Sequence, residues 1–297
     1  MIKELESIEY KIPGRDEVTR YEKIHNVCVD SAEQGSKLVA NEIANSIRKC
    51  SKPHFILGLA TGSSPIGVYR ELVRLHKEDG LSFKKVITFN LDEYFSIEKN
   101  NEQSYHSFMH QHLFSHIDIV KRNINIPQGK LLEEDISNYC DKYEKKINSL
   151  GGIDFQILGI GRTAHIGFNE PGSNQNSCTR IVSLDSMTRQ DAAEDFNGIE
   201  SVPKRAITMG IRTILSAKRI VLLAWGHKKS NVISKSIEGE IDFNYPASFL
   251  QKHNNTTFIL DNESSAQLIK HKTPWLVKDF IWTDELRKKA ITWLSTK

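Results

Sequence analysis

Short apolar segments of strand length alternate with helical segments along most of this chain, and no other feature restricts the fold as strongly. The apolar segments read HFILGLA, KVITFN, FQILGIG, AITMG, RIVLLAW and TTFIL. Helical spacing of apolar residues predicts helices at about 31–50, 66–76, 104–114, 136–147, 211–217, from 229 and at 264–270. Strands joined by helices form parallel sheets with crossover connections. The sequence therefore predicts an α/β fold, a mostly parallel sheet with helices on both faces.

We expect a single domain over residues 31–270. An N-terminal extension, 1–30, precedes it, and a C-terminal tail, 271–297, follows and ends in a helix. The tail carries three tryptophans, which we expect to pack on the core or on a partner subunit: Trp275, Trp282 and Trp293.

Charge and cysteine content exclude several classes of protein. The 297 residues include 40 Lys and Arg and 37 Asp and Glu, a net charge of +3 without a basic run, which disfavours nucleic acid as the main partner. No apolar run approaches the roughly 18 residues of a membrane span, and the charged N-terminus does not resemble a secretory signal. The four cysteines form no CxxC pair. We therefore expect a cytoplasmic protein with free thiols and no membrane contact.

Ligands of open parallel sheets bind beyond the carboxyl ends of the strands. Four loops with polar side chains follow predicted strands, at 61–64, 90–94, 161–171 and 226–229, and we expect all four at one edge of the sheet. In the first loop, Thr61, Gly62, Ser63 and Ser64 precede Pro65, which suits a helix start. Such a helix N-terminus can hold a phosphate, although a plain cap by Ser63 or Ser64 without a ligand explains the pattern equally well.

The other loops offer acid, base and cation. Asp92, with Glu93 beside it, follows a buried strand, where desolvation would make it a general base; a turn with solvated acids is the alternative. His165 and Glu170 lie on one glycine-rich loop and form a candidate proton-transfer pair, whereas a structural histidine is the alternative. Lys229 is either a contact for an anionic substrate or part of an exposed turn.

A cluster of histidines raises the question of a metal site. The segment 104–116 contains two pairs at i, i+4 spacing, His106 with His110 and His112 with His116, and this spacing can bind zinc on a helix. The HExxH pattern is missing, and the apolar residues between them indicate an amphipathic helix. We expect no metal and, because no GxSxG motif occurs, no α/β-hydrolase chemistry.

The motifs GLATGSSPIGVYRELVRLH, VITFNLDEYFSI and LGIGRTAHIGFNEPGS resemble the glucosamine-6-phosphate deaminase (isomerase) family, and similar segments cover about residues 31–262. The resemblance implies a modified Rossmann-like domain, usually a homo-oligomer. Such enzymes convert glucosamine 6-phosphate to fructose 6-phosphate and ammonia through an open-chain enediol(amine), without metal or organic cofactor. The chain also resembles the deaminase-like N-terminal part of longer proteins that carry a deacetylase-like domain.

The resemblance also implies roles for individual residues. Asp92 would move a proton between C2 and C1 of the sugar. His165 would assist ring opening with Glu170 as its partner. The loop from Thr61 to Ser64 and the side chain of Lys229 would hold the phosphate.

Three positions depart from the family pattern. Thr163 stands where the family has an acid, and we keep it among the candidate catalytic residues because of its hydroxyl. Glu194 aligns with a phosphate-binding arginine, and Val182 aligns with a basic residue of the family's allosteric site. These changes predict weak activity or a less charged substrate, and no such allosteric activation. A deaminase-like sugar-binding or regulatory protein remains an alternative; a related sugar-phosphate lactonase is a further one, which the FNLDEY motif disfavours.

Overall fold

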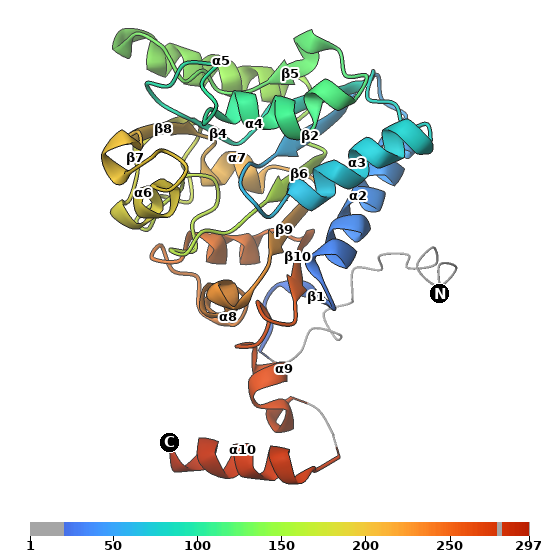
Figure 1. Ribbon diagram of the computed structural model, residues 1–297, viewed down its shortest axis with the longest axis vertical. Helices are drawn as coiled ribbons and strands as arrows, with labels where there is room; N and C mark the ends of the chain where they lie inside the picture. Colours follow the sequence, from blue (N-terminus) through green and yellow to red (C-terminus); the bar gives the residue numbers. More distant parts are fainter. Residues whose placement is uncertain (1–20, 278–280, 297) are drawn as a thin grey trace.

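The computed structural model describes residues 21–277 and 281–296. Its centre is a seven-stranded parallel sheet (Figure 1). In spatial order the strands are β1 (His25–Val29), β10 (Thr256–Asp261), β9 (Ile220–Ala224), β6 (Phe155–Leu158), β2 (Phe55–Leu59), β3 (Val86–Asn90) and β5 (Ile124–Asn125). Strands β2, β3, β6 and β9 are buried at every position, as expected for a parallel sheet covered on both faces.

Helices cover both faces of the sheet, which confirms the α/β prediction. One face packs against α2 (Ala32–Lys49), α3 (Ile66–Glu78) and α4 (Tyr105–His112). The opposite face packs against α5 (Ile136–Ser149), α7 (Ile211–Leu215), α8 (Ser230–Glu238) and the 3-10 segment η7 (Pro246–Lys252). Shorter 3-10 turns lie at η2 (Phe114–His116), η3 (Lys121–Asn123), η4 (Glu133–Asp135), η5 (Ile199–Ser201), η6 (His227–Lys229) and η8 (Pro274–Leu276).

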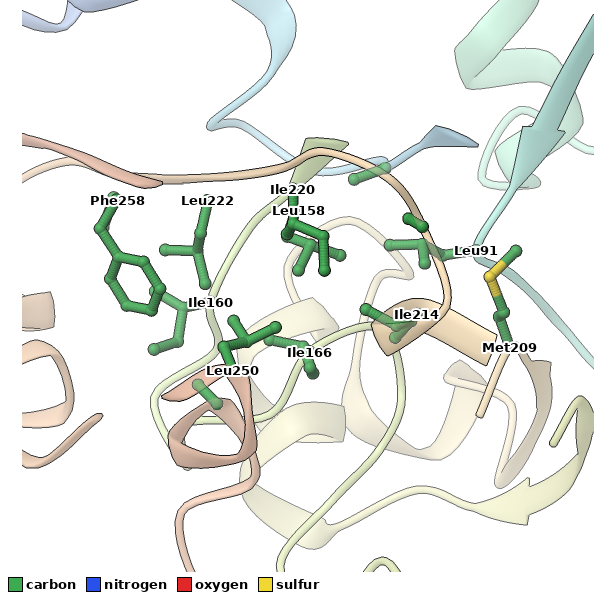
Figure 2. Close-up of a cluster of buried hydrophobic side chains, with 14 of the residues drawn as sticks. Leu91, Leu158, Ile160, Ile166, Met209, Ile214, Ile220, Leu222, Leu250 and Phe258 are labelled. Atoms are coloured by element: carbon green, nitrogen blue, oxygen red, sulfur yellow. The ribbon is translucent and has the colours of Figure 1, made fainter. Parts of the chain in front are cut away.

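The core on the second face also anchors a loop. Figure 2 shows Leu158 and Ile220 from the sheet beside Ile166 from the loop that follows β6. All three side chains are fully buried. Burying such a side chain stabilises the fold by about 1.5–3 kcal/mol, so this part of the loop is held as firmly as the strands.

A smaller antiparallel sheet stands beside the main one and corrects the sequence prediction. It consists of β4 (Asp92–Tyr94), β8 (Arg205–Thr208) and β7 (Arg180–Ser183), and α6 (Ser186–Ala192) follows β7. We expected a loop at 90–94 and AITMG as a strand of the main sheet. Instead the chain leaves β3 and, after one residue, pairs Asp92–Tyr94 with β8.

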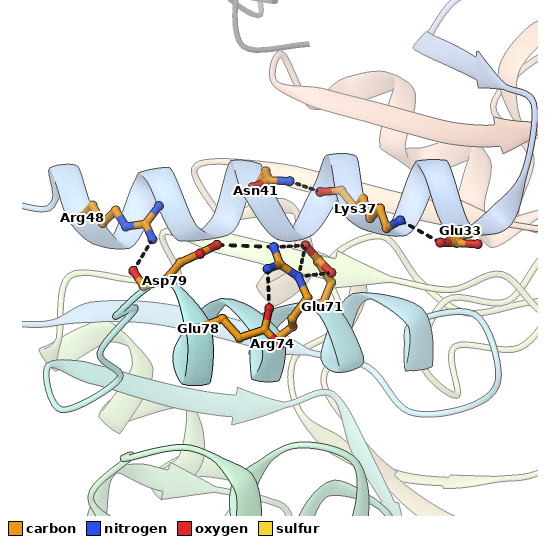
Figure 3. Close-up of polar contacts among 8 residues, drawn as sticks. All are labelled: Glu33, Lys37, Asn41, Arg48, Glu71, Arg74, Glu78 and Asp79. Carbon is orange, nitrogen blue, oxygen red and sulfur yellow. Dashed lines mark hydrogen bonds and ion pairs between the residues drawn. The ribbon is translucent and has the colours of Figure 1, made fainter. Parts of the chain in front are cut away.

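A polar network joins the outer surfaces of α2 and α3 (Figure 3). Arg74 contacts the carboxylates of Glu71, Glu78 and Asp79, and Arg48 of α2 donates to the Asp79 carbonyl at 3.2 Å. Partly exposed ion pairs contribute at most about 1 kcal/mol each. The network therefore fixes the carboxyl ends of these helices. The position of the amino end of α3 depends instead on the loop before it.

The two ends of the chain differ from expectation in detail. Strand β1 lies within the segment expected as an extension, yet it pairs with β10; residues 1–20 are outside the described residues. The helix expected at 264–270 is reduced to turns followed by α9 (Ile269–Lys272). The final helix is present as α10 (Asp284–Ser295), at the lower end of Figure 1.

The tail tryptophans pack on one another. The Trp275 ring stacks on Trp282 with centroids 6.2 Å apart and meets the edge of Trp293 at 6.1 Å.

Among the helices in the described ranges, none combines the length and apolarity needed to cross a bilayer.

Candidate active site

The four loops singled out in the sequence do meet at one edge of the sheet. Strands β9, β6, β2 and β3 are consecutive neighbours, and each loop follows the carboxyl end of one of them. Two hydrogen bonds join the loops directly. Trp225 Nε1 donates to the Ser64 carbonyl at 3.0 Å, and Lys229 Nζ donates to the Ile160 carbonyl at 2.7 Å.

The loop after β2 precedes an uncapped helix. Pro65 takes the N-cap position of α3 with an αR backbone, and no side chain caps the helix, so the alternative of a cap by Ser63 or Ser64 is wrong. Gly62 adopts a left-handed φ of 89°, which favours glycine. The free hydroxyls and the first-turn N–H groups of α3 remain available to an anion.

Asp92 is a buried acid on the second sheet. It lies opposite Thr208 in the β4–β8 pair and is only 5% exposed. Burial first, and then the charge of Glu93, raise the pKa of Asp92 well above its ordinary range. A carboxylate with a raised pKa is a stronger base, as removal of a proton from carbon requires.

The loop after β6 lies directly against the β4–β8 pair. The Phe168 N–H donates to the Thr208 hydroxyl at 3.0 Å. At Gly167, where φ is 55°, a Cβ atom would stand 3.3 Å from Asp92 Oδ2 and 2.9 Å from the Thr208 hydroxyl. A glycine therefore permits the close approach that brings Asp92 beside the loop carrying His165.

His165 and Glu170 form the pair expected from the sequence, and two threonines complete it. His165 Nδ1 lies 3.0 Å from Glu170 Oε2 and 2.9 Å from the Thr163 hydroxyl. Thr163 donates to Glu170 Oε2 at 3.0 Å, and Thr188 donates to Oε1 at 2.6 Å. Burial opposes ionisation of Glu170, but the hydrogen bonds from His165, Thr188 and Thr163 outweigh it and lower its pKa.

These contacts select one tautomer of His165. Both threonine hydroxyls donate their hydrogen bond to Glu170. The hydrogen bond between the ring and the carboxylate therefore uses a proton carried by His165 Nδ1. Nε2 is then the unprotonated nitrogen and can accept a proton. The ring lies over Gly161, where a Cβ atom would stand 2.1 Å from Nε2.

Two cations lie near the end of β6. Lys229 is half-buried, and burial lowers its pKa, while Asp191 and Arg162 are its charged neighbours. Arg162 Nε donates to Asp191 Oδ2 at 2.9 Å. Glu194, which aligns with a phosphate-binding arginine, is exposed just beyond α6 and forms no ion pair within 21–277 and 281–296.

Thr188 is the site residue that sequence reasoning missed. It lies on α6, far along the chain from Glu170, and no local pattern marks it. The segment SMTR around it belongs to the stretches that resemble the family, and this was the available signal.

The histidine-rich helix does not form a metal centre in the part of the chain that the structure describes. No group of three or more His, Cys, Asp or Glu side chains suited to a metal ion occurs there. His106 and His110 contact each other, with ring centroids 4.5 Å apart.

The arrangement as a whole suits proton transfer on a small anionic molecule. It combines a buried base, an imidazole with a free Nε2 and an anion site at a helix N-terminus.

Comparison with known proteins identifies relatives. A family model described as glucosamine-6-phosphate isomerases/6-phosphogluconolactonases matches residues 30–259. Over 242 residues the chain is 46% identical to a glucosamine-6-phosphate deaminase of Clostridium botulinum, covering 82% of this chain and 98% of that protein. A glucosamine-6-phosphate deaminase-like protein of Bacteroides thetaiotaomicron is 44% identical over 93% of this chain, which spans only 42% of that longer protein.

Solved structures agree. A monomeric glucosamine-6-phosphate deaminase matches with a TM-score of 0.79 and 43% identity, covering 82% of this chain and 100% of that one. A 6-phosphogluconolactonase from Trypanosoma cruzi matches with a TM-score of 0.66 at 21% identity, covering 84% and 98%. At that identity the match shows the shared fold alone.

Proposed function

The chain belongs to the family of glucosamine-6-phosphate isomerases and 6-phosphogluconolactonases, and we propose that it is a deaminase: it converts glucosamine 6-phosphate, or a close analogue, to fructose 6-phosphate and ammonia. The observation that carries the proposal is the buried, high-pKa carboxylate of Asp92 beside the loop that holds the His165–Glu170 pair. Two relatives at 43% and 46% identity are named deaminases and one at 44% a deaminase-like protein, whereas the lactonase shares 21%.

Ring opening is the first step. His165 Nε2 accepts the proton of the sugar's O1 hydroxyl, the C1–O5 bond breaks, and the imidazolium gives this proton to the ring oxygen O5. Glu170 stabilises the imidazolium that forms in between, since its carboxylate accepts from Nδ1. The phosphate binds at Thr61–Ser64 and the first turn of α3, with Lys229 as its cationic contact.

Isomerisation and deamination follow. Asp92 removes the proton from C2 of the open-chain aldehyde while O1 takes up a proton from water, giving the enediol(amine), and Asp92 then returns its proton to C1. The product is a C2 imine; water adds to C2 and ammonia leaves. One base serves both carbons because they are neighbours on one face of the substrate.

The departures from the family pattern fit this function better than the sequence suggests. The Thr163 hydroxyl hydrogen-bonds both His165 and Glu170, and Thr188 supports Glu170 from the other side. We therefore propose that these two threonines complete the relay without a second acid.

The decisive experiment measures ammonia and fructose 6-phosphate released from glucosamine 6-phosphate by the purified protein. Asp92→Asn keeps the shape but removes the base, so turnover should fall by about 10²–10⁴-fold with KM little changed. Asp141→Asn, on the exposed surface of α5, is the matched control. Tight binding of the sugar phosphate without turnover in the wild type would contradict the proposal and favour a regulatory sugar-binding protein.

Subunit number and location are part of the proposal. The four free thiols support a cytoplasmic protein. The family resemblance implies a homo-oligomer, although the 43% identical structure is that of a monomeric deaminase. Light scattering of the pure protein decides between one subunit and several.

A further inference from the structure

A cavity of about 730 Å³ opens beside β4, the strand that carries Asp92, and none of the candidate catalytic residues lines it. We call it the basic cavity, and its polar lining consists of Glu93, Glu98, Lys99, His106, His110, Lys121, Gln128 and Lys130. Successive side chains of a strand point to opposite faces. Because Glu93 lines the cavity and its neighbour Asp92 faces the loop of His165, the cavity lies behind β4 as seen from the catalytic site.

The rim of the cavity carries an excess of positive charge. Lys130 pairs with Glu98, which cancels one lysine. Lys99 and Lys121 have no carboxylate partner within 21–277 and 281–296, and both are exposed at the opening. Two unpaired lysines converging on one cavity suit a doubly charged anion such as a phosphomonoester.

The histidines of α4 supply neutral hydrogen-bonding groups. Their rings contact each other with centroids 4.5 Å apart. Burial first, and then the charge of Lys99, lower the pKa of His106 to about 4, and the same two causes lower the pKa of His110. Both imidazoles are therefore neutral near pH 7. The His106 ring hydrogen-bonds the Lys99 backbone, so the N–H of His110 is the one left for a ligand.

The Glu93 carboxylate lies in the cavity wall, where it is hydrogen-bonded to backbone N–H groups rather than paired with one of these lysines. Oε1 accepts the N–H groups of Tyr94 at 3.0 Å and Tyr105 at 2.9 Å, and Oε2 accepts that of His106 at 3.0 Å. The side chain thereby holds the first turn of α4 against β4. It is buried at the cavity wall, next in sequence to Asp92.

Apolar side chains make up another part of the wall, and they distinguish this cavity from a patch for a bare ion. Ile97, Ile124, Ile126 and Pro127 line it together with the backbone around Gly129. A volume of about 730 Å³ lies within the range of small-molecule sites and far exceeds the space of a phosphate ion.

We propose that the basic cavity is a second ligand site, which binds a phosphomonoester of sugar-phosphate size, with the phosphate at Lys99 and Lys121 and the sugar against the isoleucine wall. It is distinct from the catalytic site because it shares no residue with it. A ligand in this cavity lies beside Glu93, which is next to Asp92 on β4.

The test counts binding sites by calorimetry with 1,5-anhydroglucitol 6-phosphate, a sugar phosphate whose ring cannot open and which cannot be turned over. The wild type should bind two equivalents. Lys99→Ala/Lys121→Ala should retain one, with affinity at the cavity reduced at least about 100-fold, since each lysine–phosphate contact is worth about tenfold or more. Lys77→Ala, an exposed lysine of α3 outside the cavity, should still bind two.

Two further ligands separate the parts of the proposal. Inorganic phosphate should bind the cavity more weakly than the sugar phosphate, and 1,5-anhydroglucitol should not bind it. Binding unchanged by the double variant would overturn the proposal, and equal affinity for phosphate alone would overturn the sugar assignment. If instead the proposed function is wrong, the wild type binds one equivalent, and the double variant loses it.

Discussion

Gly161→Ala should damage catalysis while leaving the fold intact. A Cβ atom at position 161 would stand 2.1 Å from Cε1 and Nε2 of His165, whereas ordinary contacts begin near 3.4 Å. The imidazole must therefore move by about 1.3 Å, the difference between these distances. A misplacement of about 1 Å in a catalytic group can cost roughly 100-fold in rate. We expect kcat to fall about 100-fold.

Stability should change little, because the atoms in conflict belong to a ring at the end of a side chain that can turn. The backbone of Gly161 also lies outside the left-handed region, so alanine fits its conformation. The assay compares kcat and KM for glucosamine 6-phosphate with the thermal midpoint Tm of each variant.

Gly159→Ala provides a matched control in the same loop. A Cβ atom there meets nothing within 4 Å, so kcat and Tm should stay near the wild-type values. If Gly161→Ala is as active as Gly159→Ala, the position of the His165 ring does not matter and the proposed role of Nε2 is refuted. Equal losses in both variants would point to loop rigidity instead.

Three further predictions concern charge. Thr163→Asp places a second carboxylate about 3 Å from Glu170, where repulsion opposes ionisation, so kcat should fall; a rise would show that the relay lacks an acid. Lys229→Ala should raise KM for glucosamine 6-phosphate at least about tenfold, with kcat less affected. Lys228→Ala, at an exposed position, should leave KM unchanged. Equal KM values for the two variants would show that Lys229 does not bind the phosphate. Burial raises the pKa of Glu93 from 4.5 to about 7, so folding takes up a proton in this window and the free energy of unfolding should decline from pH 4.5 to 7. Urea unfolding at several pH values should show a shallower decline for Glu93→Gln, and an unchanged slope would contradict the assignment.

The main sheet was predictable because its signal is repeated. Each buried strand contributes a continuous apolar run, and the helices between them force parallel connections, so the edge where ligands bind follows from the strand ends. The pairing of His165 with Glu170 was also predictable, since both lie on one short loop.

Other features depend on contacts that a linear pattern does not contain. Strand β4 has three residues, too few for a periodicity, and it exists only because β8 comes back beside it. The amino end of α3 depends on the backbone of Pro65, which displaces the expected serine cap. Thr188 reaches Glu170 from helix α6. The partners of β4 and Thr188 are distant in sequence, and the αR backbone of Pro65 follows no sequence pattern, so only the folded chain shows these features.

Strand β4 unites the two proposals, because it places two adjacent acids in different surroundings. Asp92 faces the catalytic loop, and Glu93 faces the basic cavity. The charge of Glu93 is one cause of the raised pKa of Asp92, and Glu93 itself has a pKa of about 7, so it changes charge near neutral pH. An anion in the cavity favours the protonated form of Glu93 and thereby removes a negative charge from beside Asp92. A ligand of the basic cavity is therefore expected to act on the base itself, without moving the backbone.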